Sequence, residues 1–128
     1  MEPTDADAWY LLGAASIEAD DIDGAIEALT RAVLFVPDYT EAYEKLIVAY
    51  EEKGLEAETR YARGMLAYSQ ERYDDAVTEL EAAIEASPEL AVAYAGLGLT
   101  LESRSQREDA VAAYQQALEL DPESFSAR

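Results

Sequence analysis

The chain has 128 residues, half of them hydrophobic, so it is long enough to bury a substantial core within one domain. Its 28 acidic residues outnumber nine basic ones and give a formal net charge of −19, which argues against binding to nucleic acid or anionic membranes. The chain contains no cysteine and no histidine, which removes disulfides, the usual zinc ligands and the usual general base.

The first predicted helix spans about residues 6 to 19, and Thr4 or Asp5 is placed to cap its N-terminus. The turn that follows has three aspartates before Gly24, an arrangement that invites comparison with a calcium loop. In such a loop the first and twelfth positions carry ligating acids, and here they are alanine and threonine. We therefore predict no metal site and expect Asp21 to cap the next helix.

The second predicted helix spans about residues 23 to 36 and ends in three apolar residues, Leu34, Phe35 and Val36. The corresponding helices later in the chain carry acids or serine in place of Leu34 and Val36. We therefore predict that this apolar end contacts a capping element or a second copy of the chain.

The third predicted helix spans about residues 40 to 53 and begins like the first, with Tyr43, Leu46 and Tyr50 on its apolar face. Ile47 stands where the first helix has a glycine, and a branched side chain there keeps a following helix at a distance. We expect this helix to lack an ordinary hairpin partner, and Ile47 to join the capping or oligomer contact.

Gly54 predicts that the chain turns after the third helix. In that arrangement the third helix covers the apolar end at residues 34 to 36. The alternative is that the third and fourth helices fuse into one helix about 45 Å long, which would favour a swapped dimer. We favour the turn.

Four further helices are predicted at about residues 56–70, 73–86, 89–103 and 107–120. Paired acids stand near the start of the fifth and seventh helices, at Asp74 with Asp75 and at Glu108 with Asp109. We expect them to cap these helices or to interact with their N-terminal dipoles, as in the first turn.

One spacing of small residues, a large residue and proline occurs three times in the chain. It runs through Gly13, Ala25, Leu29, Ala32 and Pro37, then Gly64, Ala76, Leu80, Ala83 and Pro88, then Gly98, Ala110, Tyr114, Ala117 and Pro122. Glycine and alanine let two helix backbones touch, and the proline ends each unit. Each unit is therefore a helix hairpin that must stack on its neighbours to bury its apolar face.

This pattern resembles the tetratricopeptide repeat family, whose signature has a tryptophan, leucine, glycine and tyrosine set, then spaced alanines, then proline. The match is closest at Trp9, Leu12 and Gly13 and at Tyr94, Leu97 and Gly98. The resemblance covers about residues 6 to 124 and implies an all-α, TPR-like α-solenoid of helix hairpins that binds proteins. We predict seven helices in a single domain, 1–128, with repeats at 6–39, 57–90 and 91–124 and a half repeat at 40–56.

In this family, ligand contacts usually come from the inner face of the first helices of the repeats. The resemblance places these candidate peptide-binding residues here: Tyr10, Ile17, Tyr61, Met65, Tyr68, Leu99 and Glu102. The face is apolar and aromatic with an acidic margin, so we expect an apolar or basic segment of a protein or peptide. The alternative is that these side chains pack against neighbouring helices.

We predict neither catalysis nor a cofactor, and no nucleic-acid or membrane partner. The alternative function is a homo-oligomer, such as a homodimer, built through residues 34 to 36 and the third helix. Seven arginines and two lysines beside 28 acids favour a salt-rich cytoplasm, although the acids could instead serve a basic partner. We expect a cytoplasmic protein and a module of a larger assembly or a longer chain.

Overall fold

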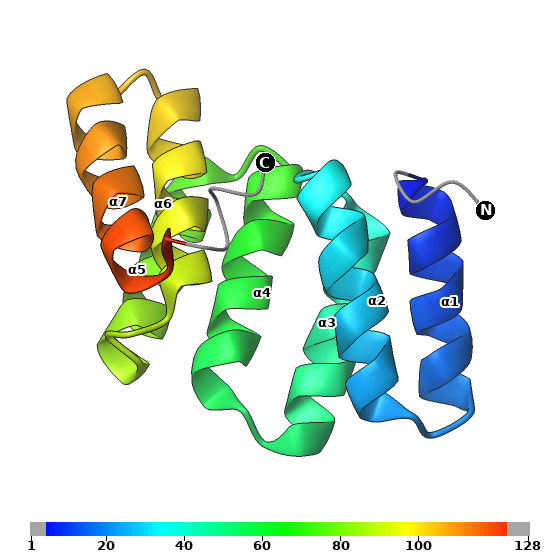
Figure 1. Cartoon of the computed structure of the whole chain (residues 1–128). Helices are drawn as coiled ribbons and strands as arrows, with labels where there is room; N and C mark the ends of the chain where they lie inside the picture. Colours follow the sequence, from blue (N-terminus) through cyan, green and yellow to red (C-terminus); the bar gives the residue numbers. More distant parts are fainter. Residues whose placement is uncertain (1–4, 123–128) are drawn as a thin grey trace.

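The computed structural model describes residues 5–122, which form seven helices joined by short turns. They are α1 (Ala6–Glu18), α2 (Ile22–Phe35), α3 (Thr40–Lys53), α4 (Glu56–Ser69), α5 (Tyr73–Ala86), α6 (Ala91–Ser103) and α7 (Arg107–Leu120). Successive helices pack side by side in chain order, from α1 at one end of the molecule to α7 at the other (Figure 1). The predicted all-α fold with seven helices is confirmed.

The helix boundaries agree with the predicted ones to within two residues, and the largest difference is at the start of α6. This helix was expected to begin at Glu89 but begins at Ala91. The two residues after Pro88 instead form a turn, in which the Leu90 amide donates to the Ser87 carbonyl at 3.1 Å.

The first two helices carry the predicted type of N-cap. Asp5 accepts a hydrogen bond from the Ala8 amide at 3.2 Å, and Asp21 accepts one from the Gly24 amide at 3.0 Å. The other candidate cap of α1, Thr4, lies outside the described residues. Each carboxylate satisfies an amide that the helix itself leaves without a partner.

For α5 and α7 the paired acids do not cap the helix, and the alternative, an interaction with the helix dipole, agrees with their position. Arg72 and Gln106 stand at their N-cap positions, and neither side chain caps its helix. The paired acids lie inside the first turn instead, where a negative charge interacts favourably with the helix dipole. The turns before these helices therefore differ from the turn before α2 in how they satisfy the backbone.

The same turn geometry nevertheless recurs in all three hairpins. Asp20, Glu71 and Ser105 occupy equivalent places between the two helices of each hairpin, with φ of 64°, 62° and 64°. Residues other than glycine rarely adopt this left-handed conformation, and the residue types at these positions do not predict it. The recurrence shows that the hairpin packing, and not the residue type, imposes this backbone.

The predicted close approaches of helix backbones are present within each hairpin. A Cβ atom added at Gly13 would lie 2.5 Å from Leu29 Cγ, and one added at Gly64 would lie 2.8 Å from Leu80 Cγ. An added Cβ at Gly98 would lie 2.6 Å from an aromatic ring carbon of α7. The three closest helix pairs in the molecule are accordingly α1 with α2, α4 with α5, and α6 with α7.

The chain turns between α3 and α4, and a fused helix is excluded. Gly54 ends α3 in the left-handed conformation, with φ of 69°, and α4 begins two residues later. Glycine adopts this conformation without steric cost. α3 thereby packs against α2 on one side and against α4 on the other.

The prediction that α3 covers the apolar end of α2 is wrong. Leu34, Phe35 and Val36 remain between 37% and 48% exposed. α2 buries Val33, and successive residues of a helix are rotated by about 100°, so Leu34 and Phe35 point away from this buried face. Val36 follows the last helical residue as the C-cap. Ile47 is half-buried and packs against the core, so it contributes to packing within the chain.

Contacts between the first helices of neighbouring units change at the α3–α4 turn. α1 contacts α3 in the first part of the chain, whereas α4 contacts α6 in the second. Within residues 5–122 the backbones of α2 and α4 do not approach each other, and neither do those of α3 and α5. Figure 1 shows α3 behind α2, with α4 and α6 in front. The inner face of α1 and α3 therefore does not continue into that of α4 and α6.

Buried tyrosines fill the joint between α3 and α4. Tyr43 donates a hydrogen bond to the Pro37 carbonyl at 2.8 Å, and its hydroxyl lies near that of Tyr61. Tyr50 packs in the same core, with its hydroxyl near Thr30 of α2. Burial raises the pKa of all three tyrosines, Tyr50 to about 12, so their hydroxyls remain neutral donors at physiological pH.

Candidate functional site

The residues expected to bind a peptide do not lie on one surface. Tyr10 and Ile17 belong to α1, which contacts only α2 and α3 among the described helices. Tyr10 stacks on Tyr39 of the α2–α3 turn, with ring centroids 5.3 Å apart. The other candidates lie on α4 and α6, which contact each other. The change of contacts at α3 thus separates α1 from the rest of the expected set.

Tyr61 and Met65 lie in the core. Met65 is 2% exposed, and its sulfur would be 2.6 Å from a Cβ atom added at Gly96 of α6. Tyr61 is covered from the other side, where its hydroxyl reaches Tyr43 of α3. In this structure both side chains hold α4 against its neighbours, as the packing alternative expects.

Three of the predicted residues form a partly accessible surface, which we call the α4–α6 face: Tyr68, Leu99 and Glu102. Tyr68 and Leu99 are half-buried against the core, and Glu102 is exposed. The Tyr68 hydroxyl interacts with Ser103, which brings the C-terminal ends of α4 and α6 together. The face therefore has an aromatic and aliphatic floor with a carboxylate at its margin.

Glu102 is held in place by a tyrosine of the last helix. Tyr114 donates a hydrogen bond to Glu102 Oε1 at 2.8 Å. Burial is the main cause that raises the pKa of Tyr114, and the hydrogen bond to Glu102 adds to it. Burial likewise raises the pKa of Tyr68. Both phenols are neutral at physiological pH, and Glu102 keeps a second oxygen free of this bond for a cationic group.

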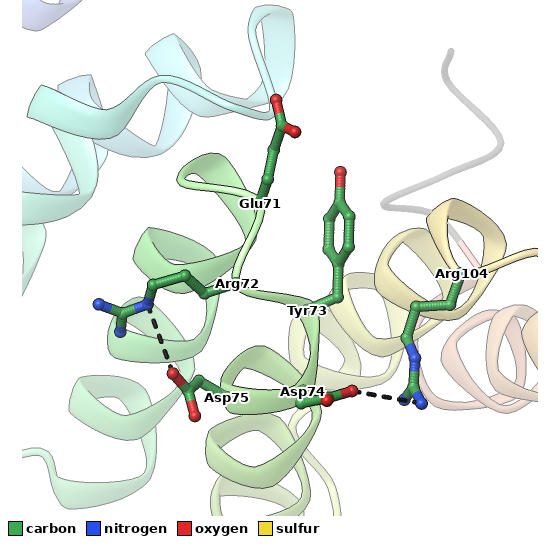
Figure 2. Close-up of a pocket in the computed structure, with 6 residues that line it drawn as sticks. All are labelled: Glu71, Arg72, Tyr73, Asp74, Asp75 and Arg104. Carbon is green, nitrogen blue, oxygen red and sulfur yellow. Dashed lines mark ion pairs between the residues drawn. The ribbon is translucent and has the colours of Figure 1, made fainter.

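A shallow hollow of about 460 Å³ lies beside this face, where the α4–α5 turn meets the α6–α7 turn (Figure 2). Its lining residues are Glu71, Arg72, Tyr73, Asp74, Asp75 and Arg104. Asp74 pairs with Arg104 at 3.3 Å, and Arg72 pairs with Asp75 at 3.4 Å. Figure 2 shows Glu71 and Tyr73 pointing to the same side, away from these two ion pairs.

Tyr73 connects the hollow to the α4–α6 face. Its ring centroid lies 6.0 Å from that of Tyr68, with the two planes tilted by 55°. Sequence reasoning did not select Tyr73, because it counted residues only along the first helices of the repeats. The left-handed turn at Glu71 orients the start of α5, and the residue types in that turn do not predict it.

No group of three or more acids is placed to hold a metal ion in the part of the chain that the structure describes. The described helices also include none that is long and apolar enough to cross a membrane.

Comparison with known protein families identifies the repeats. A tetratricopeptide repeat model matches residues 61–125, which is half of the chain, and a second tetratricopeptide repeat model matches residues 6–39. The chain belongs to the tetratricopeptide repeat family. Members of this family are in general protein-interaction modules without catalytic activity.

Individual relatives are more distant. A peroxisomal targeting signal receptor of Candida albicans is 32% identical over 74 residues, or 58% of this chain. The chain spans only 12% of the length of that receptor. The crystal structure of MamA is 30% identical, with a TM-score of 0.42, and the match covers 98% of this chain and 63% of MamA.

YrrB, described as a TPR protein with an unusual peptide-binding site, has the same fold. The two chains superpose with a TM-score of 0.56 at 18% identity, and the match covers 94% of this chain and 71% of YrrB.

Proposed function

We propose that this tetratricopeptide repeat chain binds an apolar and basic segment of a protein or peptide on the α4–α6 face. The observation that supports this proposal is the grouping of Tyr68, Leu99 and Glu102 beside Tyr73. Aromatic rings offer large contact area at low entropic cost, and a carboxylate at their margin attracts a cation. YrrB, a protein of the same fold, is described as having a peptide-binding site.

The charges around the face favour a basic partner. Glu102 lies on the face itself, and Glu71, Asp74 and Asp75 line the adjoining hollow. The two arginines of the hollow are already paired with Asp74 and Asp75. A lysine or arginine of the partner could stack on Tyr68 or Tyr73 and approach Glu102. The net charge of −19 would further increase the association rate of a basic segment.

The test uses three synthetic peptides of equal length, one rich in leucine and arginine, one rich in leucine and glutamate, and one of serine and glycine. Fluorescence anisotropy should detect binding of the first peptide only. Replacing Leu99→Asp or Glu102→Lys should weaken this binding by about tenfold or more, since each removes apolar contact or reverses a charge.

Val48→Asp is the matched control, because Val48 is an exposed apolar residue of α3, outside the α4–α6 face. It should leave peptide binding unchanged. Equal binding of all three peptides, or loss of binding only in the Val48 variant, would refute the α4–α6 face. Met65 is unsuitable for this test, because its burial means that an acid there would disturb folding.

A second candidate function is self-association through the apolar end of α2. The observation that favours it is the contiguous exposure of Leu34, Phe35 and Val36. Light scattering over a range of concentrations at high salt tests this candidate. A dimer that the Phe35→Asp variant abolishes would support it, and a dimer that this variant leaves intact would exclude this patch.

We also propose that the chain acts without catalysis and in a salt-rich cytoplasm. The acidic composition supports the second point, because high salt screens the repulsion among its carboxylates. The melting temperature should then rise along a series of increasing salt concentration. A melting temperature that stays constant or falls along this series would contradict the proposed environment.

A further inference from the structure

The outward flank of α7 carries two apolar side chains that nothing in residues 5–122 covers. Val111 is 53% exposed and Leu118 is 45% exposed. They are two helical turns apart and therefore lie on the same side of α7.

The equivalent positions of the other two hairpins are covered. The repeat spacing aligns Leu118 with Val33 of α2 and with Ile84 of α5. Val33 is 7% exposed, and Ile84 packs against the core. Val111 aligns with residue 26 of α2, an isoleucine that also packs against the core.

The difference between these helices is the presence of a following helix. α3 packs on α2, and α6 packs on α5, whereas α7 has only α6 as a neighbour among the described helices. The flank of α7 therefore resembles the surface of α2 and α5 that the first helix of the next unit covers within the chain.

α1 supplies the other half of such a joint. Leu11 is 64% exposed on this helix, although its equivalents Ala62 of α4 and Gly96 of α6 are buried. A Cβ atom added at Gly96 would lie 2.6 Å from the Met65 sulfur, so this position faces the preceding hairpin. No helix precedes α1 within the described residues, so Leu11 meets no such partner.

We propose that two copies of the chain associate head to tail, with α1 of one copy packing on the flank of α7 of the next. The joint continues the interfaces already present within the chain, in which α3 covers α2 and α6 covers α5. It is distinct from the α4–α6 face and from the apolar end of α2.

The α2–α3 joint is the closer template for this contact. Leu11 aligns with Lys45 of α3, which is half-buried, so that joint accommodates a long side chain at this place. The α5–α6 joint has Gly96 there and leaves no room for a leucine. The interface should therefore resemble the packing of α3 on α2.

Such an interface is heterologous, since a different surface of each copy takes part. Each dimer keeps one free α1 and one free α7 flank, so assembly proceeds to open chains or closed rings. The net charge of −19 opposes the approach of two copies at low salt. Raising the ionic strength shortens the screening length from about 10 Å at 0.1 M to about 3 Å at 1 M and should promote assembly.

Sedimentation velocity in high salt tests the proposal with charged variants of each flank. Leu11→Asp and Leu118→Asp should each remain monomeric, whereas the unmodified chain should form species larger than a dimer at increasing concentration. An equimolar mixture of the two variants should give a dimer and nothing larger, because one intact α1 and one intact α7 flank remain. Leu34→Asp, a substitution of comparable exposure on α2, should assemble like the unmodified chain.

Cysteine pairing provides an independent measurement, since the chain has no cysteine of its own. Under mild oxidation in high salt, a mixture of Leu11→Cys and Leu118→Cys should form mixed disulfide dimers faster than either variant forms its own. Circular dichroism should show unchanged helicity in all variants, because the substituted positions are exposed.

Three results would overturn the proposal. The first is an unmodified chain that stays monomeric at every concentration and salt, and the second is assembly that persists in both aspartate variants. The third is a mixture of the aspartate variants that forms no dimer.

Discussion

The α4–α5 hairpin and the single helix α3 differ at one position that decides how each helix packs. Gly64 of α4 lets the backbone approach α5 so closely that an added Cβ would lie 2.8 Å from Leu80 Cγ. Ile47 fills the equivalent position of α3, and among the described helices α3 forms none of the three closest pairs. A glycine in the seam thus makes a hairpin, and a branched side chain leaves a helix that joins two units.

α3 has no hairpin partner and is attached to its neighbours by aromatic packing. Tyr43 and Tyr50 are buried between α2 and α4, and the Thr40 hydroxyl donates to Ser69 Oγ at 2.9 Å across the joint. At the other end of the joint Arg63 pairs with Glu51 at 2.8 Å. Backbone proximity and large side chains are therefore two separate ways to attach a helix to this array.

The largest effect is expected for Gly64→Ile, which gives α4 the isoleucine that α3 has at the equivalent position. The branched side chain would overlap Leu80 and force α4 away from α5, at a cost of about 3 kcal/mol or more. Urea unfolding followed by circular dichroism measures the loss. A variant as stable as the unmodified chain would show that the close approach is not required.

Alkaline pH destabilises the α3–α4 joint, whereas the closest contacts of the Gly13 and Gly64 seams are leucine side chains that do not titrate. Burial raises the pKa of Tyr50 from 10.0 to about 12 in the folded chain. An unfolded chain ionises this tyrosine near pH 10, so the free energy of unfolding is undiminished below pH 10. Ionisation of Tyr50 then lowers the free energy of unfolding by about 2 kcal/mol as the pH rises to about 12.

The measurement is urea unfolding at a series of pH values from neutral to alkaline. Tyr50→Phe should be slightly less stable than the unmodified chain at neutral pH, because the polar interaction of its hydroxyl with Thr30 is lost. Its stability should then decline less steeply above pH 10. Parallel declines in both proteins would contradict the assignment to Tyr50.

Gly54→Ala tests a glycine that allows a turn, between α3 and α4, instead of a close approach of two helices. Nothing lies within 4 Å of an added Cβ there, so the only expected cost is that of a left-handed alanine, about 1 kcal/mol. The same urea unfolding experiment applies. A loss as large as that of Gly64→Ile would mean that the two glycines do not act by different mechanisms.

Glu71→Gly is the smallest of these changes and acts in the opposite direction. Glycine removes the steric cost of the left-handed backbone at φ of 62°, but it also increases the conformational entropy of the unfolded chain. We therefore expect the free energy of unfolding to rise by only a few tenths of a kcal/mol. Thermal melting at neutral pH measures it. A marked destabilisation would show that the Glu71 side chain supports the turn in some other way.

The sequence predicted the helices well because the features that determine them are local. The spacing of glycine, alanine and proline placed every hairpin, and Gly54 correctly marked the turn after α3. The extent of burial at the α3–α4 joint was harder to predict from the sequence. Ile47 indicated that α3 lacks a hairpin partner, yet no local signal showed that Leu34 and Phe35 would stay exposed.

The candidate site was predicted only in part, for a related reason. Tyr68, Leu99 and Glu102 follow from their places along the first helices, which a repeat pattern fixes. The burial of Tyr61 depends on where α3 lies, which is a contact between units. Tyr73 lies beside Tyr68 through a backbone turn that the residue types did not reveal.

The single helix pair that links the two parts of the array limits how they communicate. Within residues 5–122, the backbones of α2 and α4 do not approach each other and neither do those of α3 and α5, so α3 with α4 is the one helix pair that joins the two halves. In a linear array, cooperativity passes from neighbour to neighbour. A strain or a bound ligand at one end therefore influences the other mainly through this α3–α4 joint, which makes the joint the natural boundary between two units of cooperative opening.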